Sequence, residues 1–313
     1  MEIGKLPTKT LEEIILNPIN NLKFKRSEIV VRPKTGEDCS AVDLNNELLV
    51  ISTDPITGAE KNSGYIAVHI NCNDAASSGA EPIGILLTVL MPPTSTKETL
   101  TEIMNGAYKA ANELKIEILG GHTEVTDAVN KPIISGTVIA KSNNRKFISS
   151  SGAKIGQDVI MTKWAGIEGT SIIAHDYEEI IKNYISDDCI ENAKTFGKML
   201  SVVPEGLICA NNGATCMHDI TEGGIFGAAW EIADCSNTGI EIYIDKIPIM
   251  PETSILCRLA HINPYRLISS GSLLITAFNG EELVKILGQK DIKATVIGKI
   301  TQSEKHIVYP YAT

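Results

Sequence analysis

The feature of this sequence that most limits its fold is a polar segment, Lys141–Gly156, which separates two stretches of alternating strand and helix patterns. It contains Ser149-Ser150-Ser151-Gly152, a composition typical of loops between domains. A chain of 313 residues is also longer than most single cores. We therefore predict an α/β protein with an N-terminal domain over residues 1–148 and a C-terminal domain over residues 149–313, each with its own sheet.

The N-terminal half shows a regular order of elements. Thr10-Leu-Glu-Glu13 has the form of a capping box and predicts a helix that begins there. Apolar residues spaced three and four apart over Leu100–Leu114 predict an amphipathic helix. The remaining patterns predict strands at 48–52, 84–90, 116–119 and 132–140 and a helix at 65–78.

The C-terminal half repeats this mixture of strands and helices. The patterns predict strands at 158–162, 214–218, 239–244, 272–277 and 292–300. They predict helices near 169–176, 189–200, 204–212, 224–233, 253–260 and 280–287.

Charge and hydropathy exclude several classes of protein. The formal net charge is -10 and the most basic local patch is Lys23–Arg26, so we expect no nucleic-acid partner. We expect no membrane span, because no run approaches the ~18 uncharged apolar residues that a span requires, and the N-terminus lacks a signal-peptide pattern. The seven cysteines stand singly without metal-ligand spacing, which favours reduced thiols. Together these features predict a cytoplasmic protein.

Four clusters with carboxylates stand beside glycines or small residues. Magnesium prefers carboxylate, water and phosphate oxygens, so carboxylates that converge on one cleft would suit Mg²⁺. Each cluster could instead cap a helix or turn. The clusters are Gly36-Glu37-Asp38, Thr53-Asp54-Pro55, Asn71-Cys72-Asn73-Asp74 and His122-Thr123-Glu124.

Two segments could approach a phosphate. Gly120-Gly121 follows a predicted strand, and glycine allows backbone amides to come close to an anion. Met217–Gly224 leads into a predicted helix, whose free amides could bind an anion or simply be capped by Thr221 or Asp219. The chain contains neither the P-loop nor the dinucleotide-binding glycine pattern.

These segments, in this order, resemble the signature motifs of the superfamily of aminoimidazole ribotide synthase (PurM-like), most closely its branch related to the hydrogenase maturation factor HypE. The superfamily also contains thiamine-phosphate kinase and selenophosphate synthetase. The resemblance covers nearly the whole chain. It is carried by residues 36–42 (G-[DE]-D-x-A-V in the family), 52–54 (T-T-D), 73–82 (N-D-x-A-x-x-G-A-x-P), 120–123 (G-G-[DH]-T) and 218–224 (R-D-x-T-x-G-G).

The resemblance implies an ATP site with Mg²⁺ in a cleft, and a homodimer whose N-terminal sheets join in a shared barrel. By motif position it assigns the metal and phosphate ligands to Asp38, Asp54 and Asp74, and catalytic roles to Asp38, Asp54 and Asp219. The remaining nucleotide-side and substrate-side positions that it implies are Asn73, Gly120, Gly121, His122, Thr123, Glu124, Lys163, Glu168, Gly169 and Thr170.

The sequence departs from the family at two places. His122 stands where several members carry an aspartate, which removes one possible metal ligand. HypE carries its reacting group on a cysteine near its C-terminus, whereas the last cysteine here is Cys257, so we do not expect the HypE reaction on the chain's own tail.

The resemblance implies an enzyme that uses ATP to phosphorylate an amide-type or acyl oxygen of a small-molecule or protein-borne substrate, in a reaction related to hydrogenase maturation. A small-molecule kinase like thiamine-phosphate kinase and a non-catalytic ATP-binding partner protein are the alternatives.

Overall fold

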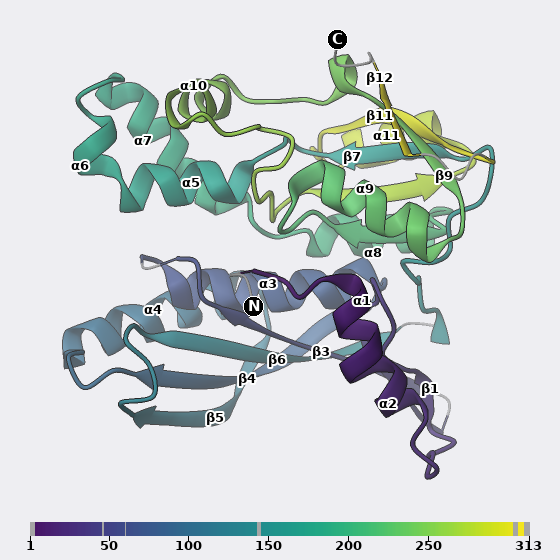
Figure 1. Cartoon of the computed structure of the whole chain (residues 1–313), viewed down its shortest axis with the longest axis horizontal. Coiled ribbons are helices and arrows are strands. Elements are labelled where there is room, and N and C mark those ends of the chain that lie inside the picture. Colours follow the sequence, from purple (N-terminus) through teal and green to yellow (C-terminus); the bar gives the residue numbers. More distant parts are fainter. Residues whose placement is uncertain (1–3, 46, 60, 143–144, 303–305, 310–313) are drawn as a thin grey trace.

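The computed structural model describes residues 4–302 and 306–309, except residues 46, 60 and 143–144. Two halves are stacked on one another, each with a six-stranded sheet (Figure 1). The first half contributes one mixed sheet and the second half another. The predicted α/β architecture with one sheet in each half is therefore confirmed.

Helices cover one face of the N-terminal sheet, and the described residues place no helix on the other, bare face (Figure 1). Helices α3 (Ser63–Ser77) and α4 (Lys97–Leu114) pack on buried strand residues such as Val50, Ile85 and Val138. The strands have the order β1 (Ile29–Val31), β2 (Ser40–Leu44), β3 (Glu47–Ile56), β6 (Ile133–Ser142), β4 (Glu81–Met91) and β5 (Glu117–Val125). Among the described strands of this sheet, only β4 and β5 pair in parallel.

Helix α3 is buried along its whole length, because it lies between the two halves. Its backbone approaches both neighbouring helices closely at glycines. A Cβ on Gly64 would lie 1.9 Å from the carbonyl oxygen of Ile103 in α4, and one on Gly206 would lie 2.2 Å from that of Ala76 in α3. Glycine therefore permits the close helix packing that places α3 at the centre of the molecule.

The C-terminal sheet carries helices on both faces. Alternate residues of β7 (Asp158–Thr162) separate the two layers, as expected for a strand. Val159 and Met161 pack with α9 (Gly224–Cys235), whereas Ile160 packs with α8 (Val203–Asn211) and α11 (Gly280–Gly288). The strand order is β12 (His306–Tyr309), β9 (Gly239–Tyr243), β11 (Ala294–Thr301), β7, β10 (Leu273–Ala277) and β8 (Cys216–Asp219).

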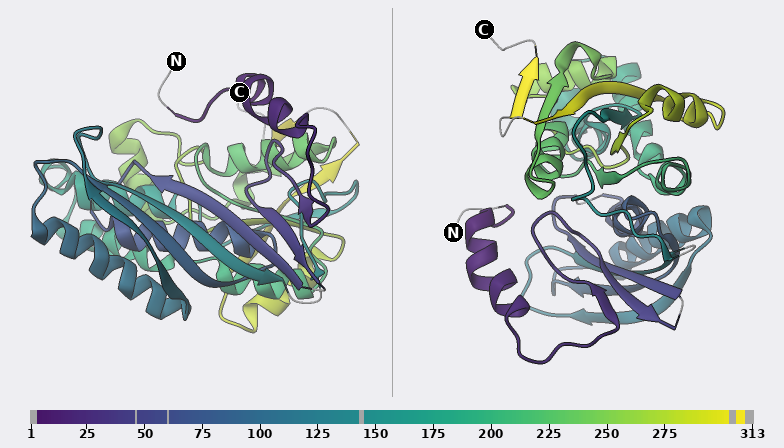
Figure 2. Two further views of the ribbon diagram at one scale, coloured as in Figure 1. Left: turned by 90° about the horizontal axis from the view of Figure 1, so that it is seen from below. Right: turned by 90° about the vertical axis from the view of Figure 1, so that its right-hand side faces the viewer.

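The remaining helices lie at the edges of this frame. A small apolar cluster holds α5 (Ile167–Asp176), α7 (Asp187–Thr195) and α10 (Pro251–Ala260) together beside the second sheet, and Figure 2 shows the N-terminal helical segment along the flank. The shorter helices are α1 (Thr8–Leu11), the π-helical turn η1 (Glu12–Leu16), α2 (Asn17–Asn20), α6 (Glu178–Ile181) and the 3-10 turns η3 (Phe196–Met199) and η4 (Ile244–Lys246). Among the described residues no helix is both long and apolar enough to cross a membrane.

Three local predictions were wrong. The first helical segment begins at Thr8 after Pro7, so Thr10 lies inside it and caps nothing. Strand β3 continues to Ile56, so Asp54 lies within a strand and not after its end. The segment Gly120–Glu124, predicted to follow the end of a strand at residue 119, forms part of strand β5.

Candidate functional site

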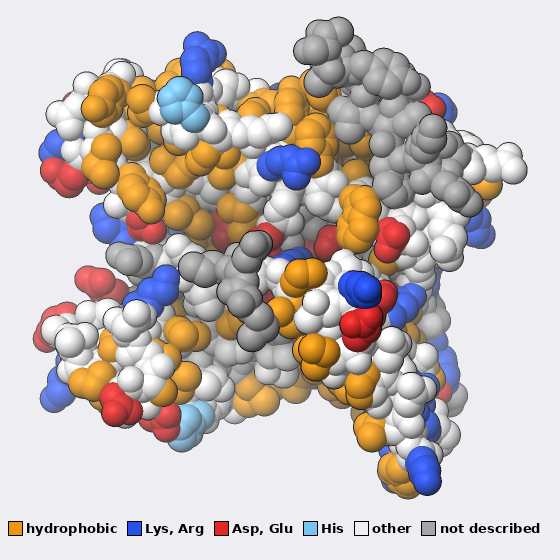
Figure 3. All heavy atoms as spheres, in the orientation of Figure 1, with side chains coloured by type: hydrophobic (Ala, Val, Ile, Leu, Met, Phe, Trp, Pro, Cys, Tyr) orange, Lys and Arg blue, Asp and Glu red, His pale blue; other side chains and the backbone are white. Residues whose placement is uncertain are grey.

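Four aspartates from distant parts of the chain gather at the junction of the two halves. Asp38 lies just before β2, Asp54 lies in β3 and Asp74 lies in the last turn of α3. Asp219 ends β8 of the second half. Figure 3 shows acidic side chains in the hollow between the halves. The fold therefore brings the predicted ligands Asp38, Asp54 and Asp74 together with Asp219, and we call these four residues the acidic cluster.

Ser52 links two members of the acidic cluster. Its hydroxyl donates to Asp74 Oδ2 at 2.6 Å and also lies 3.0 Å from the backbone carbonyl of Asp38. Ser52 points to the cluster because it is two residues before Asp54 in the same strand, and side chains two apart share one face. The contacts fix the loop that carries Asp38 against helix α3.

Asn71 of α3 fixes the backbone of Asp54. Its side-chain oxygen accepts from Asp54 N at 2.9 Å, and its amide nitrogen donates to Asp54 O at 3.2 Å and to Ala67 O at 2.9 Å. The amide needs the space left by Gly136 in β6, where a Cβ would lie 2.5 Å from Asn71 Nδ2. Asn71 is thus a positioning residue that leaves the carboxylate of Asp54 free.

His218 brings a positive charge into the cluster. Its side chain is 2% exposed, and its nitrogens lie 2.9 Å from Glu231, 3.7 Å from Asp219 and 3.9 Å from Asp38. Burial alone would lower the pKa of His218, but the carboxylates of Asp219, Glu231 and Asp38 raise it well above its usual value. The imidazolium therefore offsets part of the negative charge.

Crowding of the carboxylates shows in their proton affinities. Desolvation, with the charges of Asp38 and Asp219, raises the pKa of Asp54 to about 7. The side chain of Asp38 is 42% open to the cleft, yet protein groups around it still raise its pKa to about 6, mainly by desolvation and the charge of Asp219. Burial raises the pKa of Asp74 well above its usual value, and Asp219 is the largest charge that adds to this. A cation bound among these carboxylates would reduce their mutual repulsion and so stabilise the site.

The residues present fit a divalent cation. A carboxylate oxygen of Asp38 and one of Asp219 lie within 4.8 Å of each other, beside the imidazolium of His218, which is protonated and is therefore not a ligand. Asp219 Oδ2 is buried and has no hydrogen-bond partner among the described residues, which is unfavourable for a carboxylate unless a further group binds it. Oxygen-rich donors of this kind suit Mg²⁺.

Three of the predicted nucleotide-side and substrate-side residues make hydrogen bonds or ion pairs within the protein instead of facing the acidic cluster. Asn73 bonds Leu200 O at 2.7 Å and Val202 N at 2.8 Å, and so joins α3 to the second half. Lys163 is mostly buried, donates to Ser201 O and Gly271 O, and pairs with Glu205. The hydroxyl of buried Thr170 contacts that of Thr253 at 2.8 Å.

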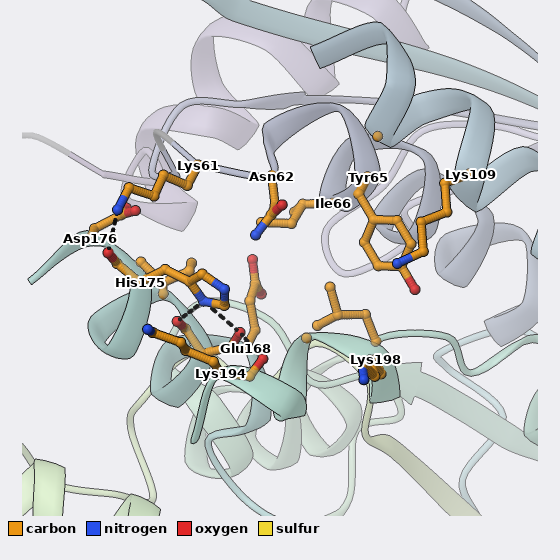
Figure 4. A pocket seen from close by; sticks show the side chains of 15 residues that line it. Lys61, Asn62, Tyr65, Ile66, Lys109, Glu168, His175, Asp176, Lys194 and Lys198 are labelled. Atoms are coloured by element: carbon orange, nitrogen blue, oxygen red, sulfur yellow. Dashed lines mark hydrogen bonds between the residues drawn. The ribbon is translucent and has the colours of Figure 1, made fainter. Parts of the chain in front are cut away.

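Glu168 and Gly169 line cavities next to the cluster. Glu168 lies in the wall between two of them, and its Oε2 has no hydrogen-bond partner among the described residues. The smaller cavity, about 240 Å³, is shown in Figure 4 with Glu168 pointing towards α3. Its lining includes Lys61, Lys109, Lys194, Lys198 and His175. The larger cavity also contains Gly169.

The segment Gly120–Glu124 does not reach the acidic cluster of its own chain. Strands β6 and β4 lie between β5 and β3, which separates β5 from Asp54 by about 14 Å. All five residues are exposed on the sheet edge, where His122 Nε2 lies 3.1 Å from Glu124 Oε2. Gly121 is required there by packing, because a Cβ would lie 1.8 Å from Leu87 O.

Sequence reasoning missed several residues of the site. His218 directly precedes Asp219 in the motif at residues 218–224, and this position could have indicated that it belongs to the site. Glu231 lies in α9, the helix that follows Asp219 in the chain. Lys5 belongs to the N-terminal segment, and its Nζ lies 3.6 Å from Glu222 Oε2. No local pattern marks Glu231 or Lys5, since only the tertiary fold brings them to the cluster.

Comparison with known proteins gives matches over most of the chain. Residues 36–141 match the domain described as "AIR synthase related protein, N-terminal domain" and residues 154–310 match the corresponding C-terminal domain. A putative hydrogenase expression/formation protein of Methanocaldococcus jannaschii is 26% identical over 97% of this chain and 90% of its own length. Carbamoyl dehydratase HypE of Bradyrhizobium diazoefficiens is 25% identical over 76% of this chain and 69% of its own length.

A solved structure has the same fold. AaThiL, complexed with AMPPCP and TMP, superposes with a TM-score of 0.77, at 19% identity, over 98% of this chain and 96% of its own.

Proposed function

The chain belongs to the family of AIR synthase related proteins, and on this premise we propose that it is an enzyme that binds Mg·ATP at the acidic cluster and phosphorylates an amide-type or acyl oxygen. The observation that carries the proposal is the convergence of Asp38, Asp54 and Asp74 of the first half with Asp219 of the second. The AMPPCP complex of AaThiL, a protein of the same fold with a bound ATP analogue, supports it.

In this proposal the three carboxylates Asp38, Asp54 and Asp74 would hold Mg²⁺. When bound, Mg²⁺ would neutralise charge on the phosphate oxygens. Ser52 and Asn71 keep Asp74 and the backbone of Asp54 in place. Asp219 faces the transferring group from the second half, with His218 limiting the repulsion among the carboxylates.

The proposed reaction converts a poor leaving group into a good one. An oxygen of the acceptor attacks the γ-phosphorus, a new P–O bond forms, and the bond to the β,γ-bridging oxygen breaks to release ADP. The phosphorylated oxygen can then depart as phosphate when a carbon centre of the acceptor reacts further. Close placement of the two reactants by the two halves of the cleft would supply much of the rate.

We also propose a homodimer formed through the bare face and edge of the N-terminal sheet. Leu86, Leu119 and Val125 are exposed there at 39%, 49% and 70%. An exposed apolar sheet edge favours pairing with another chain. A second copy could bring its own Gly120–Glu124 segment near the nucleotide, which the geometry of one chain does not allow. We keep the domain boundary near residue 148 as part of this proposal.

Two other functions are distinguished by experiment. The fold shared with AaThiL favours a small-molecule kinase as the second candidate. Incubation with γ-³²P-labelled ATP and a panel of amides and alcohols distinguishes the proposed reaction from a kinase and from a non-catalytic partner protein. Release of labelled phosphate that requires an amide acceptor supports the proposed reaction, whereas a stable labelled product supports a kinase. Tight ATP binding without turnover under every acceptor would contradict both and indicate a non-catalytic partner protein.

A further inference from the structure

The larger cavity beside the cluster has an apolar character that the proposed function does not explain. Its volume is about 880 Å³, within the range of small-molecule sites. The wall is formed by the end of β3, by α5 and α6, and by α10 with the following loop. Isoleucine, leucine and tyrosine side chains supply most of the lining, including Ile172, Ile173, Ile180, Leu256, Leu259 and Tyr184.

The wall of this apolar cavity includes residues close in the chain to members of the acidic cluster. Pro55, which directly follows Asp54 in β3, is part of the wall. Glu222, three residues after Asp219, is part of it from the other half. The charge of Asp219 also acts on Glu168 in the wall, so the cavity lies next to the cluster, and a molecule with its body among these apolar side chains could extend one end towards the carboxylates.

The charges of the lining disfavour anions. Among the described lining residues the charged ones are Glu168 and Glu222, and neither lysine, arginine nor histidine contributes. Burial raises the pKa of Glu168 to about 7, and the charges of Glu222 and Asp219 add to this effect. A phosphate or carboxylate in this cavity would meet acidic groups without a cation of the wall to pair with.

The lysines of the smaller cavity do not make the larger cavity favourable for an anion. They lie on the other side of Glu168 and Ile172, which line both cavities. Three of them already have partners: Lys61 donates to His175 O at 2.9 Å, Lys194 pairs with Glu178 and Glu191, and Lys109 lies over the ring of Tyr65.

We propose that the apolar cavity binds the acceptor, and that the acceptor has a bulky, uncharged apolar body with a single polar amide-type end at the acidic cluster. This inference rests on the proposed function. It names a substrate class different from phosphorylated metabolites. Burial of the apolar body supplies affinity, and the position of the polar end supplies the geometry for phosphorylation.

A matched pair of dyes tests the apolar and charge requirements directly. N-phenyl-1-naphthylamine is neutral, and 1-anilinonaphthalene-8-sulfonate adds a sulfonate to the same body. The neutral dye should bind at least tenfold more tightly, measured by fluorescence titration of the full chain. Equal affinity, or preference for the sulfonate, would overturn the proposal.

A variant places the binding in the cavity. Ile180 is 60% exposed on α6, so Ile180→Arg should fold normally, weaken the neutral dye at least fivefold and improve the sulfonate. The control is Ile155→Arg, at a position 53% exposed outside the cavity, which should change neither affinity. An unchanged neutral-dye affinity in Ile180→Arg would place the dye elsewhere and sink the assignment.

Linear primary amides then test the substrate class. From butanamide to octanamide, each added methylene should improve displacement of the neutral dye about fourfold, while octanoate should displace it at least tenfold less well than octanamide. Mg·ATP titrations of the same samples separate the two proposals. Dye and amide binding without Mg·ATP binding would refute the proposed function, whereas Mg·ATP binding without dye or amide binding would refute this inference alone.

Discussion

The acidic cluster and the apolar cavity are adjacent and yet chemically opposite. The cluster combines four aspartates with one buried histidine, and the cavity is walled by isoleucines and leucines. Both use the same two chain segments, since Pro55 directly follows Asp54 and Glu222 stands three residues after Asp219. In the proposed function, nucleotide binding would depend on the charged side chains and acceptor selection on the apolar ones, so a substitution in one set should leave the other property unchanged.

The largest expected effect concerns the charged region. Asp219→Asn should lower ATP turnover by about 10²–10³-fold, a loss typical when one electrostatic contact to a transition state is removed. Neutral-dye binding in the apolar cavity should stay unchanged. Steady-state turnover and dye titration measure the two, and exposed Asp291→Asn is the control. Equal losses of ATP turnover and of neutral-dye affinity would show that the acidic cluster and the apolar cavity do not act independently.

A second expected effect is on stability. His218→Gln should reduce the free energy of unfolding by about 3 kcal/mol, because breaking a buried ion pair leaves carboxylates buried without a cation. Urea denaturation without divalent ions measures it. The control is His261→Asn, an exposed position in the left-handed region that asparagine tolerates. Wild-type stability in His218→Gln would show that the cluster does not need the imidazolium.

The acidic cluster should also make stability depend on pH. The pKa of Asp54 is raised from 3.8 to about 7 in the folded protein, so between these values the folded state keeps a proton that the unfolded state releases. Stability from this group is therefore present at low pH and is lost as the pH rises towards 7. The melting temperature of Asp54→Asn minus that of wild type should increase from pH 4.5 to 7.5 without metal. A constant difference would contradict the raised pKa.

The smallest expected effect comes from the N-terminal segment. Lys5 pairs with Glu222, and nearby carboxylates, first that of Glu231, raise its pKa although burial opposes them. Lys5→Ala removes a cation that competes with Mg²⁺, and should improve Mg²⁺ affinity about twofold, as expected for a half-exposed pair. Calorimetric titration measures it, with Lys9→Ala, which pairs with Glu13 on the exposed helix, as control. Weaker Mg²⁺ binding would mean that Lys5 supports the site.

Much of the fold could be predicted because local patterns and tertiary packing agree. Helix α4 is an example, since its apolar residues repeat at three and four and its buried residues Ile103, Ala107, Ala110 and Ala111 face α3. The strand through Asp54 was missed because Pro55 normally ends a strand. It is tolerated because β2 pairs only as far as Ile51, which leaves Pro55 with β6 as its single neighbour.

The candidate site shows the limit of local reasoning more clearly. The motifs identified four aspartates that the fold brings together, because each lies in a recognisable segment. Asn71 was not predicted as a positioning residue, because its role depends on the space at Gly136, which is 65 positions away in the chain. Gly121 was predicted to follow a strand, but it lies in β5 because it pairs with Leu87 of β4, whose carbonyl leaves no room for a Cβ.

The proposed site depends most on Asp54 as a ligand of Mg·ATP. The direct test is calorimetric titration of wild type and Asp54→Asn with Mg·ATP, together with thermal melting of both proteins without ligand. Asparagine keeps the size of the side chain and removes the charge that a divalent ion requires. We predict that the substitution weakens Mg·ATP binding by about 10²-fold or more and leaves the melting temperature unchanged or higher. Unchanged Mg·ATP affinity, with a lower melting temperature, would contradict the metal site and make Asp54 a structural residue of β3.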